Sequence, residues 1–319
     1  MKILPLFGII VFVLILWNLD LSRVFQSFAD LNAYFLLMAL ALQVPIITLK
    51  ALKWKILIRS YSVDFPMVRA VTSWLVGFSI GIMTPGRMGD LARAYYLKGR
   101  LPLGKSLTTV IADRIIDVLV LISFSALGVI IFVSLYATGM GYGLFLPLLS
   151  LLFIGLVTGI YVMTRKGIMM RVLRPFYRRF IPERYGKEVS KVFHDFYGGL
   201  GDMKKRGGLV IASVCICAVT WVLGFVQVYV LSLSMDIDLS LVFIVSIIPI
   251  ITLLDALPIS FSGIGTRDAA MIFFFGFISL TSESAVSFSL LILLFNYIIS
   301  AAFGLLFWLR DPISIEFEQ

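Results

Sequence analysis

Charged residues are scarce in this chain. Of its 319 residues, 14% are charged and 60% are hydrophobic, whereas a soluble domain of this length carries about 25% charged residues. This composition excludes an ordinary soluble enzyme, a disordered protein and a disulfide-linked scaffold. The apolar residues come in runs of about 20, the length with which a helix crosses a bilayer, and the short alternating strands of a porin are absent. We therefore predict an all-α, polytopic helical membrane protein.

Residues that bind metals are also scarce. His194 is the one histidine, and it lies in a basic polar segment. The two cysteines, Cys215 and Cys217, are spaced i, i+2 in an apolar run, so they point to different faces of a helix. We expect no zinc, haem, iron–sulfur or other cofactor. Walker, Rossmann, nucleophile-elbow and HExxH motifs are absent as well, which disfavours ATP-driven pumping by this chain alone.

The apolar runs define the expected spans. Two regions, 70–96 and 239–280, are interrupted by Pro, Gly and charged residues, at 84–86 and 258–268 respectively. We interpret 3–17 as a retained helix, since no small-residue cleavage site follows it. About six full spans are expected, at 3–17, 31–49, 115–135, 143–163, 209–233 and 285–309.

The distribution of Lys and Arg predicts the orientation. Segment 165–208 holds 12 basic and 4 acidic residues, so the positive-inside rule places it in the cytoplasm of a plasma-membrane protein, together with both termini. The same rule places both ends of 70–96 inside and both ends of 239–280 outside. Each region would then be a re-entrant helical hairpin.

The return limb of the second hairpin, 269–280, supports this interpretation. Its 12 residues are too few to cross a hydrocarbon core of about 30 Å. Hairpins entering from opposite faces are typical of an inverted-topology repeat. We predict one membrane domain over 1–319, with a first repeat at 31–135 and a second at 209–309.

The hairpin tips carry the candidate functional groups. Pro and Gly break the helices, and broken backbone at membrane depth must be buried or line a wet cavity. The N-termini of the returning half-helices favour anions. Arg87 and Arg267 add forked donors suited to phosphate, while Asp90 and Asp268 either hold those guanidiniums or accept a proton. The alternative is that these charges are ion pairs that only keep the broken helices folded.

A third charged cluster stands where a span begins. Asp113 and Asp117 are spaced i, i+4 and share a helix face. They are expected to neutralise Arg114 or Arg93, or to receive a cationic group at the mouth of a cavity. Asp255 is a lone acid late in an apolar run, and Arg267 is its candidate partner.

The basic segment 165–206 alternates apolar and basic residues. This pattern favours an amphipathic helix lying on anionic lipid headgroups. Nucleic acid is the usual alternative partner of such a charge run, but a segment tethered at the membrane makes that partner unexpected.

At these tips the chain resembles the flippase-like integral membrane family related to the transmembrane region of lysylphosphatidylglycerol synthase, the multiple peptide resistance factor. The resemblance covers nearly the whole chain and rests on the order and spacing of the tip motifs together. The residues that carry it, which we take as candidate substrate-binding residues, are Pro85, Gly86, Arg87, Gly89, Asp90, Arg93, Asp113, Arg114, Asp117, Pro258, Gly263, Gly265, Arg267 and Asp268.

In the larger synthase, the membrane region is taken to translocate aminoacylated lipid that a separate soluble domain makes. This chain ends at Gln319, a few residues beyond its last span. The resemblance therefore implies a stand-alone translocator of a membrane phospholipid or a polyprenyl-phosphate-linked lipid, not an enzyme. Two alternatives remain open: a membrane enzyme acting on polyprenyl phosphates, and a proton-coupled transporter of a small anion. The oligomeric state cannot be predicted.

Overall fold

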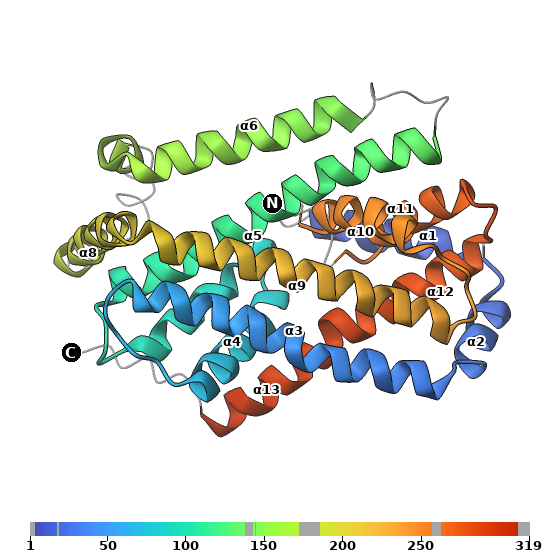
Figure 1. Ribbon diagram of the computed structural model, residues 1–319, viewed down its shortest axis with the longest axis horizontal. Coiled ribbons are helices and arrows are strands. Elements are labelled where there is room, and N and C mark those ends of the chain that lie inside the picture. Colours follow the sequence, from blue (N-terminus) through green and yellow to red (C-terminus); the bar gives the residue numbers. More distant parts are fainter. Residues whose placement is uncertain are drawn as a thin grey trace.

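The computed structural model describes residues 4–17, 19–137, 143, 145–171, 186–256 and 263–311. All regular elements within these ranges are helices, which confirms the all-α fold class (Figure 1). In chain order they are α1 (Leu4–Trp17), α2 (Leu21–Ala29), α3 (Ala33–Arg59), α4 (Met67–Ile82), the 3₁₀ helix η1 (Pro85–Leu97), α5 (Leu103–Leu135), α6 (Phe145–Thr164), α8 (Gly186–Lys205), α9 (Gly207–Ser234), α10 (Leu241–Asp255), α11 (Thr266–Gly276), α12 (Ser282–Leu293), the π-helical turn η3 (Leu294–Ile299) and α13 (Ser300–Arg310).

Several helices begin where the sequence supplies a cap. Asn32 accepts from the backbone N–H of Tyr34 at the start of α3. Ser240 and Thr281 cap α10 and α12 in the same way. These oxygens satisfy N–H groups that a first helical turn leaves unpaired.

Four helical segments in the described part are long and apolar enough to cross a bilayer: α3, α5, α9 and the continuous α12–η3–α13. A fifth is possible if α1 and α2, which meet at 92°, form one bent span. The 20-residue α6 and the short α1 cover the other two expected runs. The protein is thus a polytopic membrane protein, and the count of six spans stays a prediction.

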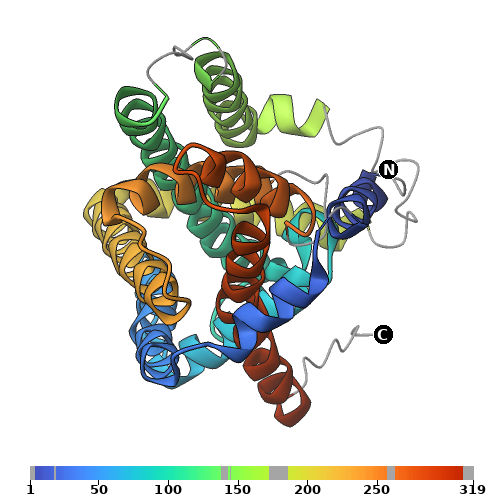
Figure 2. The same cartoon turned by 90° about the vertical axis from the view of Figure 1, so that its right-hand side faces the viewer.

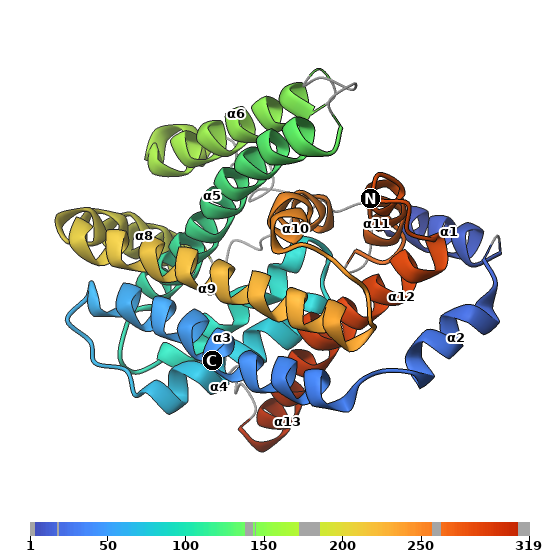
Figure 3. The same cartoon turned by 45° about the vertical axis from the view of Figure 1, so that its right-hand side comes forward.

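The long helices pack together in one bundle. Helices α3 and α9 lie side by side over most of their length (Figure 1). The bent rod α12–η3–α13, drawn in red, passes from α11 at one end to α4 at the other (Figure 2). Helix α6 contacts α5 and lies away from the α3–α9 pair (Figure 3).

Buried polar groups join this bundle in its interior. Gln43 of α3 donates to Ser300 of α13 at 2.7 Å and accepts from Gln227 of α9 at 2.6 Å. All three residues are buried. Such interhelical hydrogen bonds hold membrane helices together where water cannot compete.

Helix α4 and η1 fold back on each other. A Cβ on Gly89 would lie 2.4 Å from the carbonyl oxygen of Ile80, so glycine permits this close approach. At the other end of the pair, Arg100 donates to the carbonyl oxygen of Asp64 at 2.9 Å. The segment therefore begins and ends on one side of the molecule. Its position in a bilayer stays a prediction.

Helix α10 and α11 also fold back on each other. Phe243 near the start of α10 lies 6.2 Å from Phe275 near the end of α11, measured between ring centroids. The 11 residues of α11 rise only about 16 Å, so this limb is too short to span a bilayer. Residues 257–262, which include the expected break at Pro258, lie outside the described residues. The two-repeat organisation is likewise still a prediction.

The described end of the basic linker lies against the protein. Helix α8 packs on α5, where Lys105 pairs with Asp202 of α8 at 2.8 Å. Tyr61, just after α3, donates to the carbonyl oxygen of Gly199 of α8 at 3.1 Å. A Cβ on Gly104 would lie 2.2 Å from the carbonyl oxygen of Val192. One face of α8 is therefore covered by protein. Residues 172–185, the centre of the expected lipid-binding helix, lie outside the described residues.

Candidate functional site

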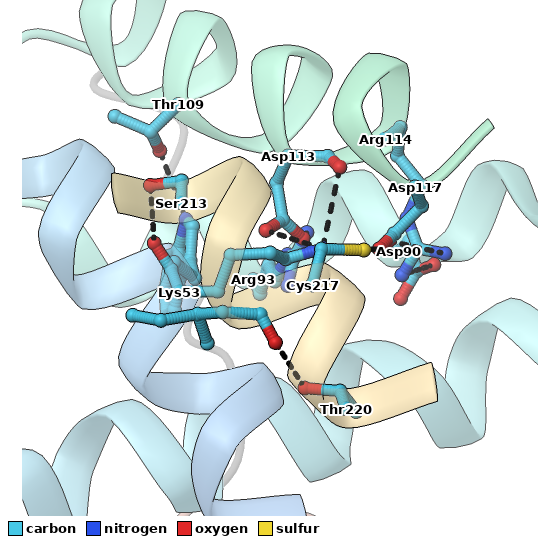
Figure 4. Close-up of polar contacts among 12 residues, drawn as sticks. Lys53, Asp90, Arg93, Thr109, Asp113, Arg114, Asp117, Ser213, Cys217 and Thr220 are labelled. Carbon is cyan, nitrogen blue, oxygen red and sulfur yellow. Dashed lines mark hydrogen bonds and ion pairs between the residues drawn. The ribbon is translucent and has the colours of Figure 1, made fainter. Parts of the chain in front are cut away.

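A buried network of charges joins η1, α5 and α3 (Figure 4). Arg93 of η1 and Asp113 of α5 are fully buried, and their Nη2 and Oδ2 atoms are 2.6 Å apart. The Nζ atom of Lys53 on α3 lies 3.0 Å from Asp113 Oδ1 and also pairs with Asp117. Charges this deeply buried are stable only when they are paired. The network therefore fixes η1 against two spanning helices.

The same network continues to the tip of the first hairpin. Asp90 of η1 pairs with Arg114 of α5. Arg114 Nη1 also lies 3.8 Å from Asp117 Oδ2. Asp113 thus pairs with Arg93 and Asp117 with Arg114, which is one of the two roles expected for these acids. The carboxylate of Asp90 is bound by Arg114. Its expected contact with Arg87 stays a prediction, because the side chains of Pro85, Gly86 and Arg87 lie outside the described part.

Lys53 is a site residue that sequence reasoning missed. Lys53 carried no expected role, yet it is 1% exposed. The physical reason is that α3 runs ten residues past its apolar stretch, to Arg59, and so carries Lys53 between two carboxylates of α5. No local signal sets Lys53 apart from Lys50 and Lys55, because its two acids lie 60 residues or more away in sequence.

A second buried cluster surrounds Arg267 on α11. Its Nη1 atom lies 3.6 Å from Asp255 Oδ2, which confirms Asp255 as its partner. Its Nε donates to Ser289 of α12 at 2.9 Å, and Ser289 in turn donates to Asp268. The aspartate that follows Arg267 therefore positions it through Ser289 and not by direct contact. Ser289 was not expected from the sequence, because a serine in an apolar run carries no charge signal.

The start of α11 is already occupied by an internal anion. Asp268 accepts from the backbone N–H of Gly265 at 2.8 Å. Gly263 and Gly265 have φ values of +81° and +86°, a conformation that favours glycine, and a Cβ on Gly263 would lie 2.1 Å from Asp255 Oδ1. A ligand phosphate at this helix end would therefore compete with Asp268.

Both hairpins contact the α12–η3–α13 rod. Tyr297 of η3 donates to Asp255 at 3.2 Å, and the Arg267 guanidinium lies over its ring at 5.5 Å. From the first hairpin, Ser79 of α4 donates to the carbonyl oxygen of Ala301 at 2.7 Å. The two hairpins thus contact the rod at Tyr297 and Ala301, within and just after the π-helical turn Leu294–Ile299. Such turns are frequent at functional sites.

The site as a whole brings most of the predicted residues into two groups. No cluster of three or more His, Cys, Asp or Glu side chains suited to a metal occurs within the described ranges. The first group is Asp90, Arg93, Asp113, Arg114 and Asp117 with Lys53; the second is Gly263, Gly265, Arg267 and Asp268 with Asp255, Ser289 and Tyr297.

Residues 4–304, nearly the whole chain with both charge clusters, match the model of the family described as the lysylphosphatidylglycerol synthase TM region. The chain belongs to this family. The expected resemblance is therefore confirmed.

Two archaeal relatives extend the comparison over full length. A UPF0104 membrane protein of Methanocaldococcus jannaschii is 26% identical over 300 residues, covering 90% of this chain and 87% of the relative. Another, of Methanothermobacter thermautotrophicus, is 25% identical over 315 residues, covering 95% and 93%. A third, of Pyrococcus horikoshii, is 20% identical over 247 residues, covering 73% and 74%. No solved structure matches the chain.

Proposed function

We propose that this protein translocates a membrane lipid or a lipid-linked precursor and is not itself an enzyme. A phosphate-bearing headgroup would move between the two hairpins while its acyl or isoprenoid tail stays in the bilayer. The matching family is the membrane region of a lipid synthase, which is consistent with a lipid substrate. Plasma-membrane location and cytoplasmic termini are part of this proposal.

The observation that carries the proposal is that two hairpins, each with a buried arginine in a charge cluster, contact the same helical rod. Arg93 and Arg267 are 0% and 1% exposed and belong to different hairpins. Both hairpins contact the α12–η3–α13 rod: Ser79 of the first donates to Ala301, and Asp255 of the second accepts from Tyr297. Ionisable residues inside a membrane protein usually mark a substrate or ion pathway. Motion of one hairpin relative to the rod would expose that pathway to each side in turn.

The test is a headgroup-accessibility assay in liposomes. Purified protein is reconstituted with phosphatidylethanolamine or phosphatidylglycerol that carries a fluorophore on its headgroup, and a membrane-impermeant quencher is added outside. Translocation raises the quenched fraction above the half that protein-free liposomes show. We expect Arg267→Gln to lose this gain, because it leaves the headgroup without its buried donor.

Arg69→Gln is the matched control, since Arg69 is an exposed arginine on α4. It should behave as the wild type does. A wild type that quenches no more than protein-free liposomes, with either lipid, contradicts the proposal. Equal translocation by wild type and by the Arg87→Ala, Arg267→Ala double variant also contradicts it.

A further inference from the structure

Six buried or half-buried side chains form a row of five ion pairs with alternating charge, which we call the charge ring because both of its ends lie on η1. Its order is Asp90, Arg114, Asp117, Lys53, Asp113 and Arg93. Asp90 and Arg93 both belong to η1, so the backbone of η1 closes the ring.

The charge ring is open on one edge only. The side chains of Lys53, Asp90, Arg93 and Asp113 are at most 3% exposed, whereas those of Arg114 and Asp117 are 29% and 34% exposed. At this edge Arg114 Nη1 is 3.8 Å from Asp117 Oδ2, too far for a hydrogen bond. Arg114 is therefore the one cation of the ring that a ligand can reach from outside, and Asp117 lies beside it.

The chemistry of this edge favours a phosphate. A guanidinium offers several donors in a planar fork that matches two phosphate oxygens, and the other two cations of the ring, Lys53 and Arg93, are too buried to bind a phosphate from outside. Such a phosphate would displace the carboxylate of Asp90. Asp90 would then need a new cation, because a buried carboxylate without one is strongly disfavoured.

Arg93 can supply that cation. Its Nε and Nη1 atoms are buried and have no hydrogen-bond partner among the described residues, while Nη2 stays on Asp113. Asp90 and Arg93 are three residues apart in a 3₁₀ helix, where side chains at i and i+3 eclipse. The vacant donors are therefore on the face of η1 that carries Asp90.

We propose that Arg114 binds the phosphate group of a headgroup and that Asp90 then exchanges Arg114 for Arg93. This inference rests on the proposed function, which it deepens by naming the first contact of the headgroup. The exchange breaks the contact of Asp90 with α5 without leaving a charge unpaired, while Arg93 keeps its contact with Asp113. Each phosphate that binds thus loosens the Asp90 end of η1, which couples ligand binding to movement of the hairpin tip.

The test uses the full chain in dodecyl maltoside, a detergent without phosphate. A cysteine at Met88, which is 66% exposed two residues before Asp90, carries an environment-sensitive fluorophore in a Cys215→Ser, Cys217→Ser background. The probes are dihexanoyl phosphatidic acid, inorganic phosphate and, as a phosphate-free comparison, dihexanoyl glycerol. Binding is measured by calorimetry and hairpin movement by the fluorophore.

We expect phosphatidic acid to bind and to shift the fluorescence, and the glycerol to do neither. A response to inorganic phosphate as well supports the same site with free phosphate as a source. Arg114→Gln should weaken binding at least about tenfold, since it removes a charge-assisted contact, and Arg69→Gln should not. Arg114→Gln also removes the cation that pairs with Asp90. The Arg114→Gln, Asp90→Asn double variant is therefore tested beside it and should also fail to bind.

Asp90→Asn alone separates partner exchange from a structural role. Without its competing carboxylate, Arg114 should bind phosphatidic acid more tightly, while the Met88 signal no longer changes. A ring that only stabilises the fold predicts weaker binding instead. Binding by the double variant equal to that of the wild type overturns the inference. If wild-type liposomes still translocate lipid, only the inference about Arg114 fails and the proposed function stands. If they do not, the proposed function fails as well.

Discussion

The hydroxyl of Tyr297 donates a hydrogen bond to the carboxylate of Asp255 at 3.2 Å, and both side chains are buried. Asp255 ends α10, while Tyr297 lies 42 residues later, in the π-helical turn. The contact fixes the end of α10, the first limb of the second hairpin, to the α12–η3–α13 rod. The first hairpin also contacts this rod. The ring of Tyr297 in turn lies 6.4 Å from that of Phe78 on α4.

Removing this hydroxyl should loosen the second hairpin. Tyr297→Phe keeps the ring beneath Arg267 but leaves Asp255 with one donor fewer, so we expect a loss of about 1–2 kcal/mol in the free energy of unfolding. The measurement is denaturant unfolding in detergent. Tyr34→Phe serves as control because Tyr34 is 70% exposed. Equal stability of the two variants would contradict the assigned role.

Lys53 should be the most sensitive basic residue of α3. Lys53→Met takes one cation from the fully buried Asp113 and one from Asp117, and loss of one partner of a buried pair costs about 3–5 kcal/mol. Lys55→Met is the matched control, since Lys55 pairs at 3.6 Å with Asp64, whose side chain is 83% exposed, and such pairs contribute about 1 kcal/mol or less. Melting temperatures in detergent compare the two. A larger loss for Lys55→Met would show that the buried network is misplaced.

Gly304 allows α13 to contact α4 closely. A Cβ there would lie 2.0 Å from Ser79 Oγ and 2.1 Å from the carbonyl oxygen of Leu75, so Gly304→Ala should destabilise the protein by about 1–3 kcal/mol through overpacking. A Cβ on Gly224 of α9 would meet no heavy atom within 4 Å, and Gly224→Ala should be neutral or stabilise by up to about 1 kcal/mol. We expect Gly304→Ala to lower the melting temperature and Gly224→Ala to leave it unchanged or raise it. An equal fall in both variants would contradict the close contact.

Acid should detach α8 from α5. The hydrogen bond from Lys105 lowers the pKa of the Asp202 carboxyl below its usual range. Because the pKa is lower in the folded state, this contact contributes fully above the unfolded value of about 3.9 and is lost as pH falls through the folded value. Hydrogen exchange of Gly186–Lys205, corrected for intrinsic rates, should rise over that interval.

Asp202→Asn should remove this pH dependence and give a constant exchange rate. High salt should weaken the wild-type contact in the same direction, since the pair is partly exposed. An acid response that persists unchanged in Asp202→Asn would assign the effect to another group.

Composition and periodicity were enough to predict an all-α membrane protein, and the tip motifs were enough to predict its family. The pairing of Asp113 with Arg93 was also predictable, because two acids at i, i+4 beside arginines need nearby cations. Lys53 was not, since its acids lie 60 residues or more away in sequence. Ser289 and Tyr297 were missed for a different reason: a neutral side chain gains its role only from what the fold places beside it.

The helix type of η1 was also beyond the sequence analysis, which expected a half-helix without specifying its winding. The 13 residues of η1 form a 3₁₀ helix, which rises about 2.0 Å per residue and so spans about 26 Å. This matches the roughly 24 Å of the 16-residue α4. Because a 3₁₀ helix rises more per residue than an α-helix, the 13 residues of η1 cover about the same length as the 16 residues of α4.

The charge ring has an electrical consequence. Three cations, Lys53, Arg93 and Arg114, are balanced by three carboxylates, so the ensemble is neutral. A membrane voltage does work of about 2.3 kcal/mol on each unbalanced charge per 100 mV, and on this ensemble that work sums to zero. Asp90 and Arg93, the two members that η1 carries, also cancel each other, so voltage does no net work on this pair when the first hairpin moves.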